Sequence, residues 1–476
     1  MPKPLVARAA PDPPVTGPLA QLCVVLLVLS AGWLLLLALD PASGSRELAL
    51  GSAVAASVLA LLAVALRQGG TLLGVGGVYL TYLVLSHLGL VGVLLLVESP
   101  PSLAGMPHWT IGWAHSPAAS EAAVLAGLGI CAAALLLLRP WDPPGPSPPI
   151  SPTASGPGLV RVGFLLLGIT GVYLAVTAAT GLLPLGRGYL AYREAMALLP
   201  GYSLILVSLA TGLTFLAATA ERRHLVPALL LASVPVGILM LSGNRGEVLY
   251  PGIAALGILA RRGLHPSRRL WLGGLLALFV VIPVISATRT AEPGAAATQD
   301  WSPDAMFTEL GFTLRPFVAT VEWRADDEPL ALGRTYVIPL VRGVLRVVPV
   351  IERPTVEDTP WDVAVRLEGQ GYSVVAEAFL NFGVFGVLLV MGLVGWLLGL
   401  ADRTRTDLGL ARSGGLLAIG MNNIRNGFVF VPGQVVLILA LAALGAWLGR
   451  RQGPALTRPR RTATTARRTA RRSAAK

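Results

Sequence analysis

The segment from Ala376 to Leu400 reads AEAFLNFGVFGVLLVMGLVGWLLGL, an apolar run with two polar side chains near its start. Its length and composition predict a helix over about 373 to 400 that crosses a membrane. Glu377 and Asn381 stand four residues apart, so a helix presents them on one face. A long hydrophilic segment that contains several arginines comes directly before them. The run therefore aims a carboxylate and an amide at the place where this segment meets the membrane.

The composition of the whole chain extends this pattern. Hydrophobic residues make up 54% of the 476 residues and charged residues only 13%, which excludes a soluble globular domain. Cys23 and Cys131 lie inside apolar runs without metal-ligand spacing, so we expect buried packing residues and neither a disulfide nor a zinc site. The fold class predicted is all-α, a polytopic integral membrane protein with about 12 transmembrane helices and one large exported loop. The predicted spans are about 19–39, 48–66, 71–97, 119–138, 160–182, 201–220, 225–242, 247–260, 270–288, 373–400, 407–423 and 428–448.

The distribution of basic residues predicts the orientation, because positive charge favours the cytoplasmic side of a membrane. With the N-terminus inside, the predicted exported stretch Glu98 to Pro117 has no Lys or Arg, and the even number of spans returns the C-terminus to the cytoplasm. The sequence before the first span is polar and proline-rich, so we expect no cleavable signal peptide. The protein is therefore predicted to be a multi-pass membrane protein with both termini in the cytoplasm. The basic residues that fall inside are Lys3, Arg8, Arg67, Arg139, Arg222, Arg223, the turn Arg261 to Arg269, Arg403, Arg405 and the tail.

Composition along the chain predicts five parts. They are an N-terminal cytoplasmic tail (1–18), a four-helix membrane part (19–138), a Pro/Ser-rich cytoplasmic linker (139–158), a membrane core (159–449) with the exported loop 289–372, and a basic tail (450–476). Arg450 to Lys476 holds ten of the positive residues and no acidic ones. Without aromatic side chains to stack on bases, we expect this tail to be disordered and to contact anionic lipid, with no nucleic-acid partner.

The exported loop concentrates arginine. Between Arg289 and Gly371 it holds eight arginines and thirteen acidic residues, so it is a mixed-charge segment. Arg342 and Arg346 stand four apart in an apolar stretch, where an amphipathic helix would present two guanidinium groups together. Guanidinium groups bind diphosphate oxygens in a bidentate way. The alternative is that these arginines pair with the acidic residues of the loop itself.

Two further charged positions follow predicted spans near the same face. The sequence SGNRGEV contains Asn244, Arg245 and Glu247, and NNIRNGF contains Arg425. Charges at membrane depth cost roughly 2.5 to 3.5 kcal/mol, so they are usually functional or paired. An ion pair of Arg245 or Arg425 with Glu377 is the structural alternative to a functional role.

The order of these features resembles the bacterial O-antigen and oligosaccharide repeat-unit polymerases of the Wzy type, over about Leu159 to Trp447. The most specific part of the resemblance is the motif Gly371, Tyr372, Ser373, Glu377, Asn381, Phe382, Gly383 and Gly386. The resemblance implies an all-helical membrane glycosyltransferase that joins undecaprenyl-diphosphate-linked repeat units at the outer face of the plasma membrane. Its implied partners are a lipid-linked donor and acceptor, the bilayer, a chain-length regulator and a flippase.

The residues fit such chemistry, which requires an acceptor hydroxyl behind an anomeric carbon and a stabilised diphosphate leaving group. Glu377 is the expected general base or acceptor positioner, with Arg245 and Arg425 as the other expected catalytic residues. No D-x-D pair occurs in the exported loops, so we expect neither a metal nor another cofactor. An O-antigen ligase and a lipid-linked oligosaccharide flippase are the alternatives. The expected substrate-binding residues are Asn244, Arg289, Arg315, Arg342, Arg346, Tyr372 and Asn381.

Overall fold

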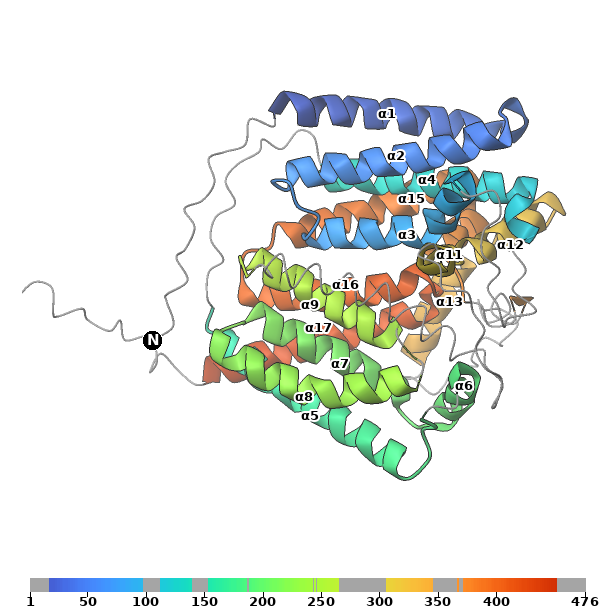
Figure 1. The fold of residues 1–476 in the computed structure, drawn as a ribbon. Helices are drawn as coiled ribbons and strands as arrows, with labels where there is room; N and C mark the ends of the chain where they lie inside the picture. The colour runs from blue at the N-terminus through green and yellow to red at the C-terminus, as the bar shows by residue number, and fades with distance from the viewer. Residues whose placement is uncertain are drawn as a thin grey trace, which may run out of the picture.

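The computed structural model describes residues 17–96, 112–138, 153–185, 188–242, 244, 246–264, 305–345, 366–367 and 371–451. Within these ranges the regular structure is helical, as predicted. Long helices run side by side in a bundle, and short helices gather at one end of it (Figure 1).

The N-terminal layer consists of four antiparallel helices (Figure 1): α1 (Gly17–Leu39), α2 (Arg46–Arg67), α3 (Val75–Leu96) and α4 (Pro117–Leu138). Ser45 accepts a hydrogen bond from the Leu48 backbone N–H and so begins α2. Two short 3-10 helices, η1 (Pro41–Ser43) and η2 (Gly112–His115), lie in the connections. Each long apolar helix satisfies its backbone polar groups by hydrogen bonds within the helix, which a lipid environment requires.

The remaining long helices are α5 (Gly156–Ala179), α7 (Tyr202–Ala218), α8 (Arg222–Leu241), α9 (Gly246–Arg261), α15 (Val374–Asp402), α16 (Asp407–Ile424) and α17 (Val431–Arg451). α15 lies next to the N-terminal layer, whereas α5 and α8 lie at the opposite side of the bundle (Figure 1). The short helices are α6 (Gly188–Leu198), α11 (Ala305–Gly311), α12 (Leu314–Ala325), α13 (Arg334–Leu345) and η4 (Phe428–Phe430).

Eight helices of the described chain are long and apolar enough to cross a membrane: α1 to α5, α8, α15 and the helix that ends the bundle, α17. This confirms a polytopic α-helical membrane protein. α7 is apolar but shorter, and α9 and α16 run beside the eight without meeting the same criteria. The predicted span 270–288 lies outside the described residues, as does much of the loop 289–372. The predicted number of twelve spans therefore stays a prediction.

Large apolar side chains cover the outside of the bundle. Leu229 and Leu230 on α8 and Leu389 on α15 each leave 67–69% of their surface exposed. In water such a surface would be unfavourable, but in a bilayer it contacts lipid tails. The pattern agrees with the membrane assignment.

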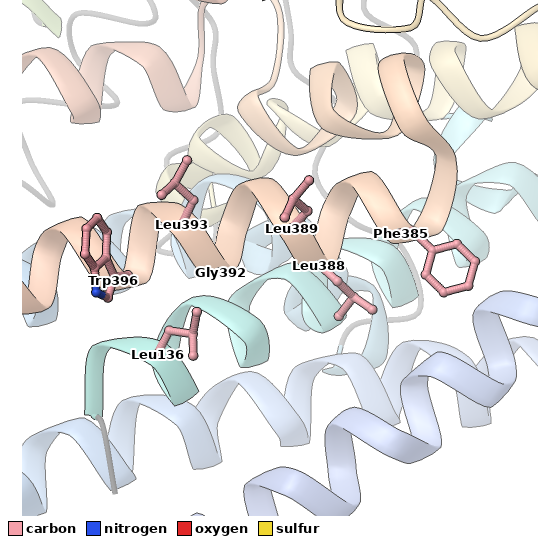
Figure 2. A pocket seen from close by; sticks show the side chains of 7 residues that line it. All are labelled: Leu136, Phe385, Leu388, Leu389, Gly392, Leu393 and Trp396. Atoms are coloured by element: carbon pink, nitrogen blue, oxygen red, sulfur yellow. The ribbon is translucent and has the colours of Figure 1, made fainter. Parts of the chain in front are cut away.

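α15 packs more extensively against α4 than against any other helix. Small residues permit this close approach: a Cβ atom at Gly395 would lie 2.0 Å from the Ala133 carbonyl oxygen, so glycine is required there. Farther out, the two helices flank an apolar groove of about 490 Å³ (Figure 2). The groove is lined by Leu136, Phe385, Leu388, Leu389, Gly392, Leu393 and Trp396.

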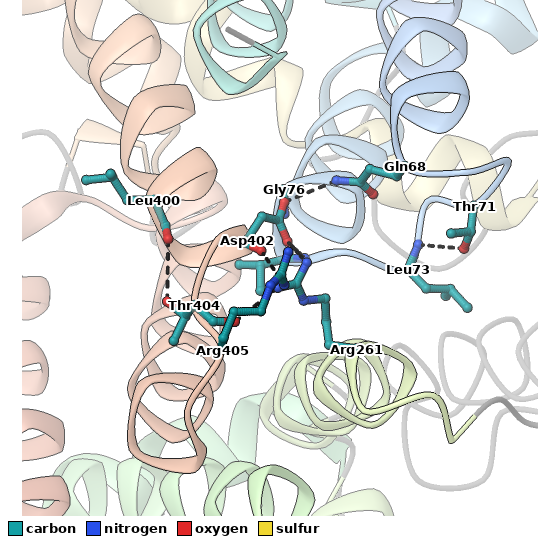
Figure 3. Close-up of polar contacts among 10 residues, drawn as sticks. Gln68, Thr71, Leu73, Gly76, Arg261, Leu400, Asp402, Thr404 and Arg405 are labelled. Carbon is teal, nitrogen blue, oxygen red and sulfur yellow. Dashed lines mark hydrogen bonds and ion pairs between the residues drawn. The ribbon is translucent and has the colours of Figure 1, made fainter. Parts of the chain in front are cut away.

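A polar cluster joins the C-terminal end of α15 to the N-terminal layer (Figure 3). Asp402 accepts hydrogen bonds from the backbone N–H groups of Val75 and Gly76, at 2.7 and 3.0 Å, and from Gln68 Nε2 at 3.1 Å. Arg261 on α9 lies 3.8 Å from the same carboxylate. The carboxylate thus satisfies the free amides at the start of α3 and ties three helices together.

The start of α1 and the end of α17 lie at the same end of the bundle, and α6, α11, α12 and α13 lie at the other end (Figure 1). The Asp402 cluster belongs to the first of these ends and the start of α15 to the second. This arrangement agrees with an even number of crossings between α1 and α17. Which end faces the cytoplasm stays a prediction.

Candidate functional site

The motif found in the sequence forms a short helix of its own at the start of α15. Ser373 begins this helix by accepting hydrogen bonds from the N–H groups of Val375 and Ala376, both at 3.2 Å. The helix is interrupted at Gly383, which has φ 65° and ψ −153°, a conformation open essentially to glycine alone. The sequence predicted one continuous helix over 373–400, so the break corrects that prediction. The segment Val374 to Phe382 is called the half-helix below.

The start of the half-helix is fixed against the end of α16. Tyr372 donates its backbone N–H to the Arg425 carbonyl oxygen at 3.0 Å. Gly371, with φ +87°, permits this contact, because a Cβ atom there would lie 2.4 Å from that same oxygen. The Tyr372 hydroxyl lies 3.3 Å from that of Thr320 on α12, and burial raises the pKa of the Tyr372 phenol. The backbone of Arg425 thus lies against the start of the half-helix that carries Glu377.

Glu377 is fully buried, with 0% of its surface exposed. Its Oε2 atom accepts a hydrogen bond from the Phe428 backbone N–H at 2.8 Å. Its Oε1 atom is buried and has no hydrogen-bond partner in the described part of the chain, although the Thr335 side chain lies nearby. One oxygen is therefore held in place while the other lacks a partner with hydrogen-bond geometry among the described residues, which is unusual because buried carboxylate oxygens are normally satisfied.

Asn381 is also fully buried, but its side chain is fully engaged. Its Nδ2 donates to Thr335 Oγ1 and to the Glu377 carbonyl oxygen, both at 2.7 Å. Its Oδ1 accepts from the Gly333 N–H at 2.8 Å. Asn381 therefore fixes the turn before α13 onto the half-helix. Its predicted contact with substrate stays a prediction.

Three aromatic side chains pack together beside the half-helix. The Tyr336 ring on α13 stacks on the Phe382 ring, with centroids 6.4 Å apart, and meets the Phe428 ring edge-on at 5.3 Å. Burial and the nearby Glu377 charge raise the pKa of the Tyr336 phenol, which stays protonated. Sequence reasoning missed Tyr336, because its position near Glu377 depends on how α13 folds back onto the half-helix.

His87 is a second residue that sequence reasoning missed. It is fully buried on α3, with Nδ1 3.1 Å from the Leu83 carbonyl oxygen and Nε2 2.6 Å from Ser373 Oγ. Since the carbonyl can only accept, Nδ1 carries the proton and Nε2 accepts from the Ser373 hydroxyl. A histidine inside an apolar span is rare, and this signal in the sequence could have identified it.

The predicted arginine Arg315 has partners in its own segment. On α12 its guanidinium lies 3.6 Å from Glu322 and 5.8 Å from the ring centre of Trp113. Arg366 likewise pairs with Glu328 and stacks on Trp323. For these two arginines the structure shows the alternative arrangement, pairing with the acidic residues of the loop.

Asn244 lies in another polar cluster, between α6, α7 and α9. Its amide hydrogen-bonds the Tyr192 hydroxyl, which lies 2.6 Å from the Tyr202 hydroxyl. Glu247 is close enough to influence both phenols. Asn244, in the sequence SGNRGEV, thus contacts a pair of tyrosines, Tyr192 and Tyr202, that differs from the aromatic cluster beside the half-helix.

Several predicted residues cannot be compared with the structure. Arg245, Arg289 and Arg346 lie outside the described residues. Arg342 belongs to α13, although its side chain is outside the description. Their roles stay predictions. Among the residues that are described, no group of three or more His, Cys, Asp or Glu side chains could hold a metal ion.

Comparison with known proteins gives two matches. A family model described as "O-antigen polysaccharide polymerase Wzy" matches residues 158–451, which is more than half of the chain. Protein CapE of Staphylococcus aureus is 27% identical over 239 residues, which span 50% of this chain and 54% of CapE. The match thus spans about half the length of that relative. No solved structure matches.

Proposed function

Since this chain belongs to the Wzy family of O-antigen polysaccharide polymerases, a family of membrane glycosyltransferases, we propose that it joins oligosaccharide repeat units carried on a lipid diphosphate. The lipid is undecaprenyl diphosphate and the product a surface polysaccharide. The reaction occurs at the outer face of the plasma membrane, with both termini in the cytoplasm. A flippase supplies the substrate and a chain-length regulator limits the product.

The observation that carries this proposal is the asymmetric environment of Glu377. The Phe428 N–H holds Oε2, which leaves the buried Oε1 as a proton acceptor in a fixed position. Glycosyl transfer needs such a group, because the acceptor hydroxyl must lose its proton as it attacks. Side chains of the surrounding elements exclude water, which strengthens this interaction.

In the proposed reaction, one carbon–oxygen bond forms, another breaks and one proton moves to Glu377. The acceptor hydroxyl oxygen forms a bond to the anomeric carbon of the donor, its proton passes to Glu377 Oε1, and the carbon–oxygen bond to the lipid diphosphate breaks. The diphosphate leaves with its additional negative charge, which arginines stabilise. Arg245 and Arg425 have this role in the proposal. The residues proposed to bind the rest of the substrate are Asn244, Arg289, Arg315, Arg342, Arg346, Tyr372 and Asn381.

The test is incubation of the purified chain in lipid nanodiscs with a synthetic lipid-diphosphate repeat unit, followed by separation of products by length. We expect a ladder. Glu377→Gln should slow its formation about 10²- to 10⁴-fold, because the amide cannot take the proton. Glu328→Gln is the matched control, because that carboxylate follows α12, is partly exposed and pairs with Arg366, so its change should leave the rate unchanged.

The alternatives give different results in this assay. Transfer of the glycan only to a foreign acceptor would indicate a ligase, and transport of the intact lipid without new glycosidic bonds would indicate a flippase. A Glu377→Gln protein that is inserted and expressed normally and still makes the ladder at the normal rate would exclude Glu377 as the base.

A further inference from the structure

The aromatic side chains beside the half-helix form a surface with an exposed edge. They come from three elements that are distant in sequence: Tyr336 from α13, Phe382 from the half-helix and Phe428 from η4. Phe382 keeps 37% of its surface exposed and so forms the outer edge of the cluster, whereas Glu377 is fully buried. Aromatic faces with a few fixed polar groups are typical of small-molecule binding sites.

Two polar atoms of this cluster are buried without a partner among the described residues. One is Glu377 Oε1 and the other is the hydroxyl oxygen of Tyr336. The two side chains are close enough for the Glu377 charge to act on the Tyr336 phenol. A buried polar group without a hydrogen bond is unfavourable, so a pair of them close together indicates that a polar ligand completes the site.

The chemistry of the pair selects the ligand. A protonated phenol donates a hydrogen bond and a carboxylate accepts one, so neighbouring hydroxyl groups of a sugar satisfy both. The apolar face of a sugar ring packs on an aromatic ring. A diphosphate does not fit, because its charge would be repelled by the Glu377 carboxylate.

From this arrangement we infer that Tyr336, Phe382 and Phe428 form the binding site for the acceptor sugar. The ring of the sugar lies on the aromatic side chains, one hydroxyl donates to Glu377 Oε1 and a neighbouring hydroxyl accepts from Tyr336. The inference rests on the proposed function, because it takes the sugar at Glu377 to be the one that loses a proton. The donor diphosphate does not share this aromatic surface and is bound by the arginines of the proposed function.

Tyr336→Phe tests this assignment, because it removes the hydroxyl and keeps the ring and its packing. The full chain in nanodiscs receives saturating lipid-diphosphate donor and a varied concentration of a short lipid-free oligosaccharide with the acceptor sugar at its end. We expect kcat/KM for the acceptor to fall about tenfold, which is the effect of one hydrogen bond, while KM for the donor stays within about twofold.

The matched control is Tyr173→Phe. The Tyr173 hydroxyl donates to the Pro200 carbonyl oxygen at 2.9 Å, away from Glu377, so its removal should leave both constants unchanged. An acceptor kcat/KM within twofold of the wild-type value in Tyr336→Phe would overturn the inference. A parallel fall of the donor and acceptor constants would also overturn it.

A binding measurement separates the inference from the proposed function. Equilibrium binding of the same oligosaccharide to the full chain, without donor, requires no turnover. If the wild-type chain makes no polymer but binds the oligosaccharide about tenfold more tightly than Tyr336→Phe does, the proposed function fails and the sugar site stands. If the ladder forms and Tyr336→Phe binds the oligosaccharide normally, the inference alone fails.

Discussion

The N-terminal layer lies outside the segment that matches the family model, whereas the half-helix lies inside it. The two regions nevertheless contact each other at the start of the half-helix. The match begins at residue 158 and so leaves out α1 to α4. In the structure, however, α15 packs most extensively against α4, and His87 of α3 holds the residue that begins the half-helix. Asp402 at the far end of α15 binds the first amides of α3. The segment that matches the family model is therefore smaller than the set of helices that holds the half-helix in place.

The contacts between the two regions have physical consequences for the predicted domains. The predicted boundary between the parts 19–138 and 159–449 stays a prediction, but α15 is in contact with residues on both sides of it. We expect the layer to act as the support on which the half-helix is positioned. Three changes test this expectation.

The largest effect is expected from Gly395→Ala. The added Cβ atom would lie 2.0 Å from the Ala133 carbonyl oxygen, so α15 and α4 must separate. Overpacking of this kind costs about 1–3 kcal/mol, and we expect a lower Tm together with a loss of polymer formation. Gly168→Ala on α5 is the matched control, because nothing lies within 4 Å of its Cβ position. Equal melting temperatures of the two variants in the same detergent would contradict a tight α4–α15 contact.

A smaller effect is expected from His87→Ala. The loss of the hydrogen bond to Ser373 loosens the start of the half-helix, so kcat should fall about tenfold with little change in KM. His87→Gln supplies another acceptor and should restore part of the rate. The control is Ser86→Ala, a neighbouring buried hydroxyl without a partner in the described chain. Normal kcat in His87→Ala would mean that the layer does not position the site.

The smallest effect is expected from Glu328→Gln, which breaks an exposed pair inside the matched segment. The Arg366 hydrogen bond lowers the pKa of Glu328 below its usual 4.5, so the pair contributes stability above that pH and loses it as pH falls through the lowered value. Because both side chains are partly exposed, we expect only about 0.2–1 kcal/mol. Wild type and variant should therefore melt nearly together at pH 7 and converge further at pH 3. A difference that grows with acidity would contradict this sign.

The sequence predicted the parts of the fold that depend on local composition. Apolar runs identified the long helices, and the i, i+4 spacing put Glu377 and Asn381 on one face. The break at Gly383 was missed because glycine is common within membrane helices. Tyr336 and Phe428 approach Glu377 only through tertiary contacts between distant segments, which no single-sequence pattern encodes. The full engagement of Asn381 by the turn before α13 was invisible for the same reason. His87 differs, because a histidine inside an apolar span is itself a signal in the sequence.

The break at Gly383 also bears on how deep Glu377 lies in the bilayer. An unbroken helix of 29 residues would be about 43 Å long, well beyond a hydrocarbon core of about 30 Å. The piece from Val384 to Asp402 alone has roughly 19 residues and a length of about 28 Å, which matches that thickness. We therefore expect the half-helix to be surplus to the crossing and Glu377 to lie at the level of the lipid headgroups. The proposed lipid-linked substrate carries its diphosphate at the same level, so it would not need to leave its normal position in the bilayer to reach the carboxylate.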